Sequence, residues 1–401
     1  MTDHTGRDAT EAIPDELLAT RSEDPETALS TADETLLAEV LDGDQRALAR
    51  VLTKIENRDD GARDLLAALH DHAGTTPVLG VTGSPGAGKS TLVDELTDHY
   101  REQDEQLGVL AVDPSSPYTG GSVLGDRIRM GSTAGDEGVF IRSMSARGRL
   151  GGLSMATSDA VTALDAFGMD RIIIETVGAG QNEVDIVETA DTVVVVVQPG
   201  SGDDVQLLKA GILEIGDIFV VNKADMDGAA QTAADLEAMV HGQQPTGGVA
   251  GHHTPDASHP PTGNDDEAGQ DRASERDGNE EIDHNDEASE SDDTEWTPPV
   301  VETVATTGNG IDEFTAAIAD HDRYLDRSGG GETRQQQRAA ATLQRLLQRD
   351  IGAISEQLLA ANGGLDALAA AVADRQTDPY TLVRRLTEPV TSAIEQHNRH
   401  E

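Results

Sequence analysis

Apolar residues follow two different rhythms along this chain. From residue 77 to about 325, short apolar runs alternate with stretches in which apolar residues recur every three or four positions. Short runs rich in valine and isoleucine predict buried strands, and the longer spacing predicts amphipathic helices. This alternation favours an α/β fold with a mostly parallel central sheet flanked by helices. We expect seven strands, over residues 77–82, 107–113, 138–143, 171–176, 192–197, 217–221 and 299–304.

The two ends of the chain show helical spacing without strands. Residues 31–74 predict a helical N-terminal domain, preceded by a polar tail over residues 1–30 that we expect to be disordered. Residues 329–401 predict a helical C-terminal arm behind a glycine-rich hinge. The central α/β domain then covers residues 75–328. A polar stretch over about 241–296 interrupts that domain and contains almost no aliphatic residues, so we expect a disordered surface insert.

Composition narrows the partners that the chain can have. Acidic residues outnumber basic ones by 75 to 29, which gives a formal charge of −46. Such a charge repels nucleic acid and anionic membranes. It also indicates adaptation to high salt, where charges are screened within a few ångströms. The acidic insert alone does not explain the charge, because residues 251–296 hold only 16 of the acidic residues.

The sequence also excludes or disfavours disulfides, two kinds of metal site, a signal peptide and a membrane span. The absence of cysteine excludes disulfides and thiolate metal sites. The polar N-terminus and the short apolar run at 193–197 give no signal peptide or membrane span, so we expect a cytoplasmic protein. Irregular spacing favours solvated loop residues over metal ligands for four histidines of the insert, His252, His253, His259 and His284.

The strongest motif lies directly after the first predicted strand. Residues 83–90 read Gly-Ser-Pro-Gly-Ala-Gly-Lys-Ser and precede a helical run, as a phosphate loop requires. The glycines let backbone N–H groups surround phosphate oxygens, Lys89 reaches the β- and γ-phosphates, and Ser90 binds Mg²⁺. A glycine-rich turn that ends in Lys-Ser by chance is the alternative, which the strand and helix disfavour. The expected nucleotide contacts are Gly83, Ser84, Pro85, Gly86, Ala87, Gly88, Lys89, Ser90 and Thr91.

A second motif selects the base. Strand 217–221 is followed by Asn222, Lys223, Ala224 and Asp225. A carboxylate at Asp225 can accept hydrogen bonds from N1–H and the 2-amino group of guanine, a pair of donors that adenine lacks. After strand 299–304, the backbone N–H groups of the small residues Ala305 and Thr306 can meet the guanine carbonyl.

Carboxylates at other strand ends are candidates for the metal site. Glu175 ends strand 171–176, and Gly178 follows it three positions later. This spacing fits a carboxylate that holds Mg²⁺ through water and a glycine N–H that meets the γ-phosphate. Asp113 ends a neighbouring strand, at the sheet edge where ligands collect. Asp126 is a third candidate, with a helix cap or surface residue as the alternative.

Four stretches, residues 112–122, 124–130, 175–181 and 199–206, resemble the MeaB/ArgK-type G proteins. The resemblance covers roughly residues 75–325. It implies a P-loop GTPase of the signal-recognition-particle and MinD-like class. It further implies a chaperone for adenosylcobalamin-dependent methylmalonyl-CoA mutase that gates cofactor loading and protects the loaded enzyme. Members are usually homodimers, held partly by the C-terminal helices.

The resemblance also assigns roles to individual residues. It places Ser90, Asp113, Asp126 and Glu175 around Mg²⁺. The segment 199–212 resembles a mobile switch that carries Lys209 towards the nucleotide or the partner.

The chain departs from the family pattern at two places, and alternatives stay open. Val304 and Ala305 stand where the family commonly has Ser-Ala. Ala179 follows Gly178 where a catalytic glutamine would stand, and the role of Gln181 two residues later is open. This pattern fits slow intrinsic hydrolysis that a partner accelerates. The alternatives are a nucleotidase or kinase associated with the transport of lysine, arginine and ornithine, and a binding module with negligible turnover.

Overall fold

The computed structural model describes residues 29–74, 76–113, 136–145, 152–176, 189–200, 214–242 and 295–397. Seven parallel strands form one sheet in the order β3-β2-β4-β1-β5-β6-β7. Their bounds are β1 (Val78–Gly83), β2 (Leu107–Asp113), β3 (Val139–Ser145), β4 (Arg171–Thr176), β5 (Thr192–Val197), β6 (Ile218–Asn222) and β7 (Val300–Thr303). The predicted fold class and all seven predicted strands are confirmed, within one or two residues at each end.

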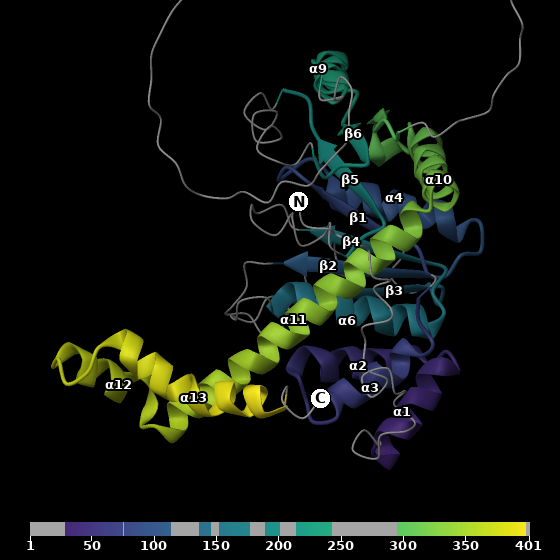
Figure 1. Ribbon diagram of the computed structural model, residues 1–401. Helices are drawn as coiled ribbons and strands as arrows, with labels where there is room; N and C mark the ends of the chain where they lie inside the picture. Colours follow the sequence, from purple (N-terminus) through teal and green to yellow (C-terminus); the bar gives the residue numbers. More distant parts are fainter. Residues whose placement is uncertain are drawn as a thin grey trace, which may run out of the picture.

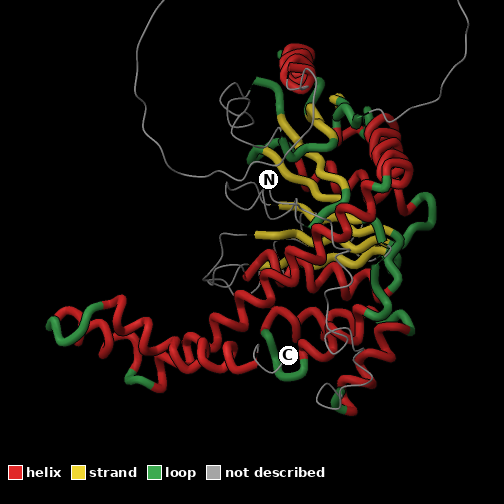
Figure 2. Tube along the Cα trace, in the orientation of Figure 1, coloured by secondary structure: helices red, strands yellow, loops and turns green. Residues whose placement is uncertain are grey.

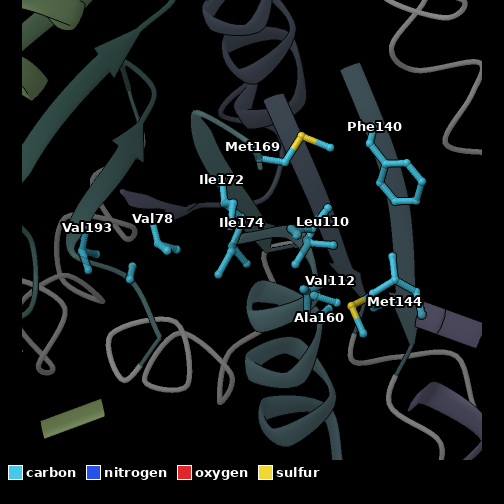
Figure 3. Close-up of a cluster of buried hydrophobic side chains, with 14 of the residues drawn as sticks. Val78, Leu110, Val112, Phe140, Met144, Ala160, Met169, Ile172, Ile174 and Val193 are labelled. Carbon is cyan, nitrogen blue, oxygen red and sulfur yellow. The ribbon is translucent and has the colours of Figure 1, made fainter. Parts of the chain in front are cut away.

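Valine and isoleucine fill both faces of the sheet. In β5, Val193, Val195 and Val197 join one hydrophobic cluster, while Val194 and Val196 join another on the opposite face. Side chains of a strand point alternately to its two sides, so a strand buried on both faces must be apolar throughout. Figure 3 shows the first cluster, in which Ala160 lies against strand side chains.

Helices cover both faces, as Figures 1 and 2 show. The first cluster is completed by α6 (Gly152–Phe167), by α9 (Ala229–Gly242) and by three N-terminal helices. The second is completed by α4 (Lys89–Arg101) and α10 (Ile311–Ser328). Crossover helices on both faces are the usual way to connect parallel strands.

The N-terminal helices share the core of the sheet domain. They are α1 (Thr31–Leu41), α2 (Gln45–Asn57) and α3 (Ala62–His70), and all three contact α6. Asp44 caps α2 by accepting hydrogen bonds from the backbone N–H groups of Arg46 and Ala47. Lys54 forms an ion pair of 2.6 Å with Asp33, which is only 6% exposed. The α1–α2 contact therefore includes a largely buried ion pair.

Of the C-terminal helices, α11 (Gly330–Ala361) crosses the sheet domain and leads to two helices that lie beyond it (Figure 1). These two are α12 (Gly364–Ala373) and α13 (Pro379–His397). No residue of the 32-residue helix α11 is buried. Among the helices that the structure describes, none carries an apolar stretch long enough to cross a membrane.

Candidate nucleotide-binding site

The predicted phosphate loop connects the central strand β1 to α4, at the carboxyl edge of the sheet. Gly83, Gly86 and Gly88 have φ angles of 128°, 79° and 91°. A Cβ atom at Gly83 would lie 2.0 Å from the carbonyl oxygen of Val196, and one at Gly88 would lie 2.4 Å from Nδ2 of Asn222. Only glycine therefore fits at 83 and 88, because both have left-handed backbone angles and because the main chain of Val196 and the side chain of Asn222 approach them closely.

Lys89 is the first residue of α4, and its side chain folds back over the loop. Its Nζ donates hydrogen bonds to the carbonyl oxygens of Gly83, at 2.7 Å, and Ser84, at 3.0 Å. The side chain is 6% exposed. Gly88, which caps the helix, offers no side-chain cap to the free backbone N–H groups of the first turn. A buried ammonium group and an uncapped helix N-terminus on one loop are suited to bind phosphate.

Two of the expected magnesium ligands lie side by side. Ser90 Oγ donates a hydrogen bond to Oε1 of Glu175 at 2.5 Å, and Glu175 is 5% exposed. Behind them the Thr176 hydroxyl donates to the Thr82 hydroxyl at 3.0 Å, which links the ends of β4 and β1. A hydroxyl and a carboxylate are hard oxygen donors, which Mg²⁺ prefers, so this pair fits the ion.

The structure describes the other predicted metal and switch residues only in part or not at all. Asp113 ends β2 one step beyond the pairing of Val112 with Thr176, so its backbone lies at the same sheet edge. The structure does not describe its side chain. Among the described residues, no group of three or more histidine, aspartate and glutamate side chains is arranged to hold a metal. Four predicted or open positions lie outside the described residues, namely Asp126, Gly178, Gln181 and Lys209.

Asn222 joins the phosphate loop to the element after β7. Its Nδ2 donates to the Ala87 carbonyl oxygen at 2.8 Å. Its Oδ1 accepts hydrogen bonds from the Ala305 backbone N–H at 3.1 Å and from the Thr303 hydroxyl at 3.2 Å. The side chain is 2% exposed, and all three partners satisfy its buried polar atoms. Asn222 therefore holds the loops together and does not face an open pocket.

The remaining base-recognition residues differ in their exposure and in the hydrogen bonds that they form within the chain. Lys223 has a left-handed φ of 62°, and its Nζ donates to the Gly86 carbonyl oxygen at 2.6 Å and to Oε1 of Gln198 at 2.8 Å. Asp225 is exposed. The Ala305 N–H is committed to Asn222, so a guanine contact from this element would fall to Thr306, which is exposed.

The fold thus gathers residues from five strand ends, those of β1, β4, β5, β6 and β7, at one edge of the sheet. Sequence reasoning did not identify Gln198 or the Thr82–Thr176 hydrogen bond. Gln198 had a visible signal, because it is the first polar residue after the five valines of β5. The threonine pair had none, since only the register of β1 and β4 brings the two hydroxyls together.

Known proteins resemble this chain along most of its length. A protein of Pyrococcus abyssi is 40% identical over 86% of this chain and 93% of its own length. A fused isobutyryl-CoA mutase of Cupriavidus metallidurans is 39% identical over 51% of this chain but only 19% of its own length. A crystal structure described as a LAO/AO transport system kinase shares the fold, with a TM-score of 0.59 and 24% sequence identity. The match covers 91% of this chain and 99% of the chain in that structure.

The family comparison is specific. Residues 48–358 match the family described as methylmalonyl Co-A mutase-associated GTPase MeaB. This range contains the phosphate loop, the Ser90–Glu175 pair and the residues around Asn222. The chain therefore belongs to the MeaB family of methylmalonyl-CoA mutase-associated GTPases.

Proposed function

We propose that the chain binds GTP and Mg²⁺, hydrolyses GTP slowly by itself, and serves as a chaperone of adenosylcobalamin-dependent methylmalonyl-CoA mutase. The observation that carries the nucleotide part is the direct bonding of the base motif to the phosphate loop. Asn222 reaches Ala87, and Lys223 reaches Gly86. One rigid unit then presents both the phosphate-binding and the base-binding groups, which favours a nucleotide that carries both.

The residues divide the work of hydrolysis between them. The Lys89 ammonium exchanges its bonds with Gly83 and Ser84 for phosphate oxygens and balances the negative charge that develops there. Ser90 and Glu175 would hold the metal, together with Asp113 and Asp126 as the resemblance implies. The ion supplies Lewis-acid stabilisation of the phosphates. Gly178 is proposed, from its spacing after Glu175, to meet the γ-phosphate through its N–H, and Lys209 to reach the nucleotide or the partner, as the resemblance implies.

Asp225 is proposed to choose the base. Its carboxylate is exposed in a loop that begins directly after the buried Asn222. A rigid strand end that carries an accessible carboxylate can pair with the two neighbouring donors of guanine. The adenine of ATP has neither donor, because its N1 is an acceptor and it carries no 2-amino group, so the carboxylate would lose both hydrogen bonds.

The mutase partner is supported by the fused isobutyryl-CoA mutase, in which one chain carries a region 39% identical to 51% of this protein. Segments joined in one protein often act on one another when they occur as separate chains. We therefore propose that the mutase accelerates GTP hydrolysis and that the protein controls cofactor loading. Cobalamin belongs to that partner in this proposal. The proposed site of action is the cytoplasm.

The decisive experiment measures GTP hydrolysis with and without purified methylmalonyl-CoA mutase. We expect low turnover alone and clear acceleration by the mutase. Lys89→Ala serves as the variant without hydrolysis, and ATP as the control nucleotide. If the protein hydrolyses no GTP either with or without mutase, it is a nucleotide-binding module with negligible turnover. Turnover that mutase does not change would contradict the chaperone role.

A second candidate is a nucleotidase associated with basic amino-acid transport. The solved structure with the same fold carries a LAO/AO transport system kinase description. Because that match has only 24% sequence identity, it supports a shared fold and nothing about activity. We therefore rank this candidate second. Phosphate transfer from the nucleotide to a transport protein, without any response to mutase, would favour it.

We further propose that the protein is a homodimer that uses its C-terminal helices. Helix α11 turns an arginine face towards the sheet domain, where Arg334 and Arg338 pair with Asp217 and Asp191. About 180° around the helix, at 100° per residue, lies an exposed apolar stripe. It consists of Leu343, Leu347, Ile351 and Ile354. An apolar stripe that faces solvent on a helix already docked by its other face is suited to a second copy.

A further inference from the structure

Strand β5 lies between the strand that carries the phosphate loop and the strand that carries the base motif. Gln198 is the first residue after this strand and is half-buried. Its Oε1 accepts a hydrogen bond from Nζ of Lys223 at 2.8 Å, and the same Nζ donates to the Gly86 carbonyl oxygen at 2.6 Å. One ammonium group thus connects the loops that follow β1, β5 and β6.

The main chain of β5 fixes the start of the phosphate loop at the same time. The backbone N–H of Ser84 donates to the carbonyl oxygen of Val196 at 3.2 Å. Gly83 pairs with Val196 so closely that a Cβ atom would collide with that carbonyl. The end of β5 therefore contacts one nucleotide-binding loop through its backbone and the other through the Gln198 side chain.

Lys223 needs such support because of its backbone conformation. Its φ of 62° lies in the left-handed region, which is unfavourable for a residue with a Cβ atom and is maintained by surrounding contacts. The two hydrogen bonds of its ammonium group are contacts of this kind. Since an ammonium group only donates, the Gln198 atom that faces it must be the amide oxygen.

We infer that Gln198 is a positioning residue for guanine nucleotide binding, which it serves by holding Lys223 across the phosphate loop at Gly86. The inference rests on the proposed guanine nucleotide function. Gln198 itself need not touch the nucleotide. It sets the place of the Lys223 side chain, which in turn fixes the phosphate loop relative to the base motif.

A competing interpretation treats the bond as an incidental surface contact. In that case, loss of the glutamine would change GDP affinity little, since water can replace an exposed hydrogen bond. The positioning role instead predicts that the amide must have the right length and must act through Lys223. Both conditions can be tested separately.

The first test measures GDP and ADP binding by calorimetry for four variants and the wild type. Because a hydrogen bond to a charged group contributes more than one between uncharged groups, we expect Gln198→Ala to weaken GDP binding about tenfold. Gln198→Asn keeps an amide but is too short, so it should weaken binding to a similar extent. Gln198→Glu keeps both the reach and an acceptor and should stay within about twofold of the wild type. Gln231→Ala, on the exposed side of α9, is the matched control and should change nothing.

The second test is a double-mutant cycle with Lys223→Ala. If Gln198 acts through Lys223, Gln198→Ala should add no further loss of GDP affinity in the Lys223→Ala background. A full additional loss there, or wild-type affinity in Gln198→Ala alone, would overturn the inference. Thermal unfolding of each variant checks that folding is retained. A wild type that binds GDP no better than ADP would refute the proposed function and the inference together. A guanine-selective wild type with an unaffected Gln198→Ala refutes the inference alone.

Discussion

At the scale of single residues, the two lysines of the site are both held by main-chain oxygen atoms of the phosphate loop. Lys89 bonds to the carbonyl oxygens of Gly83 and Ser84, and Lys223 bonds to that of Gly86. Carbonyl oxygens at these places keep each ammonium group satisfied before an anion arrives. In the proposed function, phosphate would replace the carbonyl partners of Lys89, while Lys223 keeps its bond to Gly86.

Asp225 gives the sharpest residue-scale prediction. Asp225→Asn should weaken GDP and GTP binding by a factor of at least about a hundred, because the amide N–H₂ then meets the guanine donors. Xanthine nucleotides should gain affinity, since xanthine has a carbonyl where guanine has its amino group. Calorimetric titration with GDP and XDP measures both effects. Asp227→Asn, an exposed aspartate in the same loop, is the control. Unchanged guanine preference in Asp225→Asn would remove this residue from the base site.

The sequence allowed predictions for residues whose proposed role depends on local spacing. The glycines, Lys89 and Ser90 follow from one eight-residue motif, and Asp225 from another. The roles that the sequence did not reveal depend on contacts between segments that are far apart along the chain. Nothing near Ala305 shows that its N–H is committed to Asn222, 83 residues away. Nothing near Gln198 shows that it meets Lys223, because that contact requires β5 and β6 to be neighbours.

At the scale of elements, aspartates stand directly before three successive strands and bond to the start of the neighbouring strand. Asp170 precedes β4 and accepts from the Gln106 N–H, Asp191 precedes β5 and accepts from Val78, and Asp217 precedes β6 and accepts from Val193. These bonds satisfy backbone donors at the amino edge of the sheet. Two of these carboxylates also receive the arginines of α11, so the same residues end the strands and dock the helix.

The two docked aspartates respond differently to burial. Burial raises the pKa of Asp191, and Arg338 only partly opposes this effect. For Asp217, burial also favours a higher pKa, but the nearby His321 ring and the hydrogen bonds from Arg334 outweigh it and the pKa is lowered. Arg334 forms two hydrogen bonds with Asp217, of 2.7 and 3.0 Å. Asp217 therefore stays ionised and depends on Arg334.

Loss of Arg334 should accordingly destabilise the fold. Arg334→Ala leaves the Asp217 carboxylate, which is 12% exposed, without its main partner, and we expect the free energy of unfolding to fall by about 2–4 kcal/mol. Urea unfolding can be followed through Trp296, the only tryptophan of the chain, whose Nε1 donates to the Asp217 carbonyl oxygen at 2.9 Å. Arg323→Ala, which removes an exposed ion pair, is the control. Equal stability of both variants would show that the arginine does not support β6.

The contact between α6 and α11 predicts a pH effect. Burial raises the pKa of Asp159 to about 6, against the opposing charges of Arg349, Arg345 and Arg58. The folded chain then binds this proton more tightly than the unfolded chain, so the contribution of this group to stability falls as the pH rises from about 4 to about 6. Asp159→Asn cannot titrate. The wild type should therefore lose about 2 kcal/mol relative to this variant across that range.

Thermal or urea unfolding at several pH values checks this difference. Only the difference between the two proteins matters, because many other carboxylates titrate in the same range. Asp60→Asn, an exposed aspartate between α2 and α3, controls for the removal of one negative charge. A constant difference between wild type and Asp159→Asn from pH 4 to pH 7 would contradict the assignment.

At the scale of the whole molecule, α11 links the sheet domain to helices that extend beyond it (Figure 2). The periodic apolar residues of the C-terminal region predicted helices, but the sequence could not show which face of α11 meets the sheet. Only the structure reveals that Arg334 and Arg338 form ion pairs with the sheet domain while Leu347 and Ile351 are 61% and 56% exposed. An apolar helix face is normally expected to face the core of its own chain.

The exposed stripe gives a prediction about assembly. The double variant Leu347→Glu with Ile351→Glu should convert the proposed homodimer to a monomer, because four buried carboxylates would face each other across the two-fold interface. Sedimentation measured at several protein concentrations gives the mass. Gln348→Glu adds charge to a different face of the same helix and should remain dimeric. A wild type that stays monomeric at high concentration would refute the dimer, and a dimeric double variant would place the interface elsewhere.

The acidic insert lies between α9 and β7 in the sequence. Its removal tests whether stability and GDP binding depend on it. Helix α9 ends at Gly242, and the described chain resumes at Glu295 with Trp296 close to the rings of His321 and Tyr324. Replacing residues 245–293 by a short Gly-Ser linker keeps that aromatic contact. We expect unchanged thermal stability and GDP affinity, because the removed sequence has too few aliphatic residues to join a core. A linker of scrambled insert sequence is the matched control. Loss of GDP binding only in the shortened protein would show that insert length sets the position of β7, and with it the Ala305–Asn222 bond.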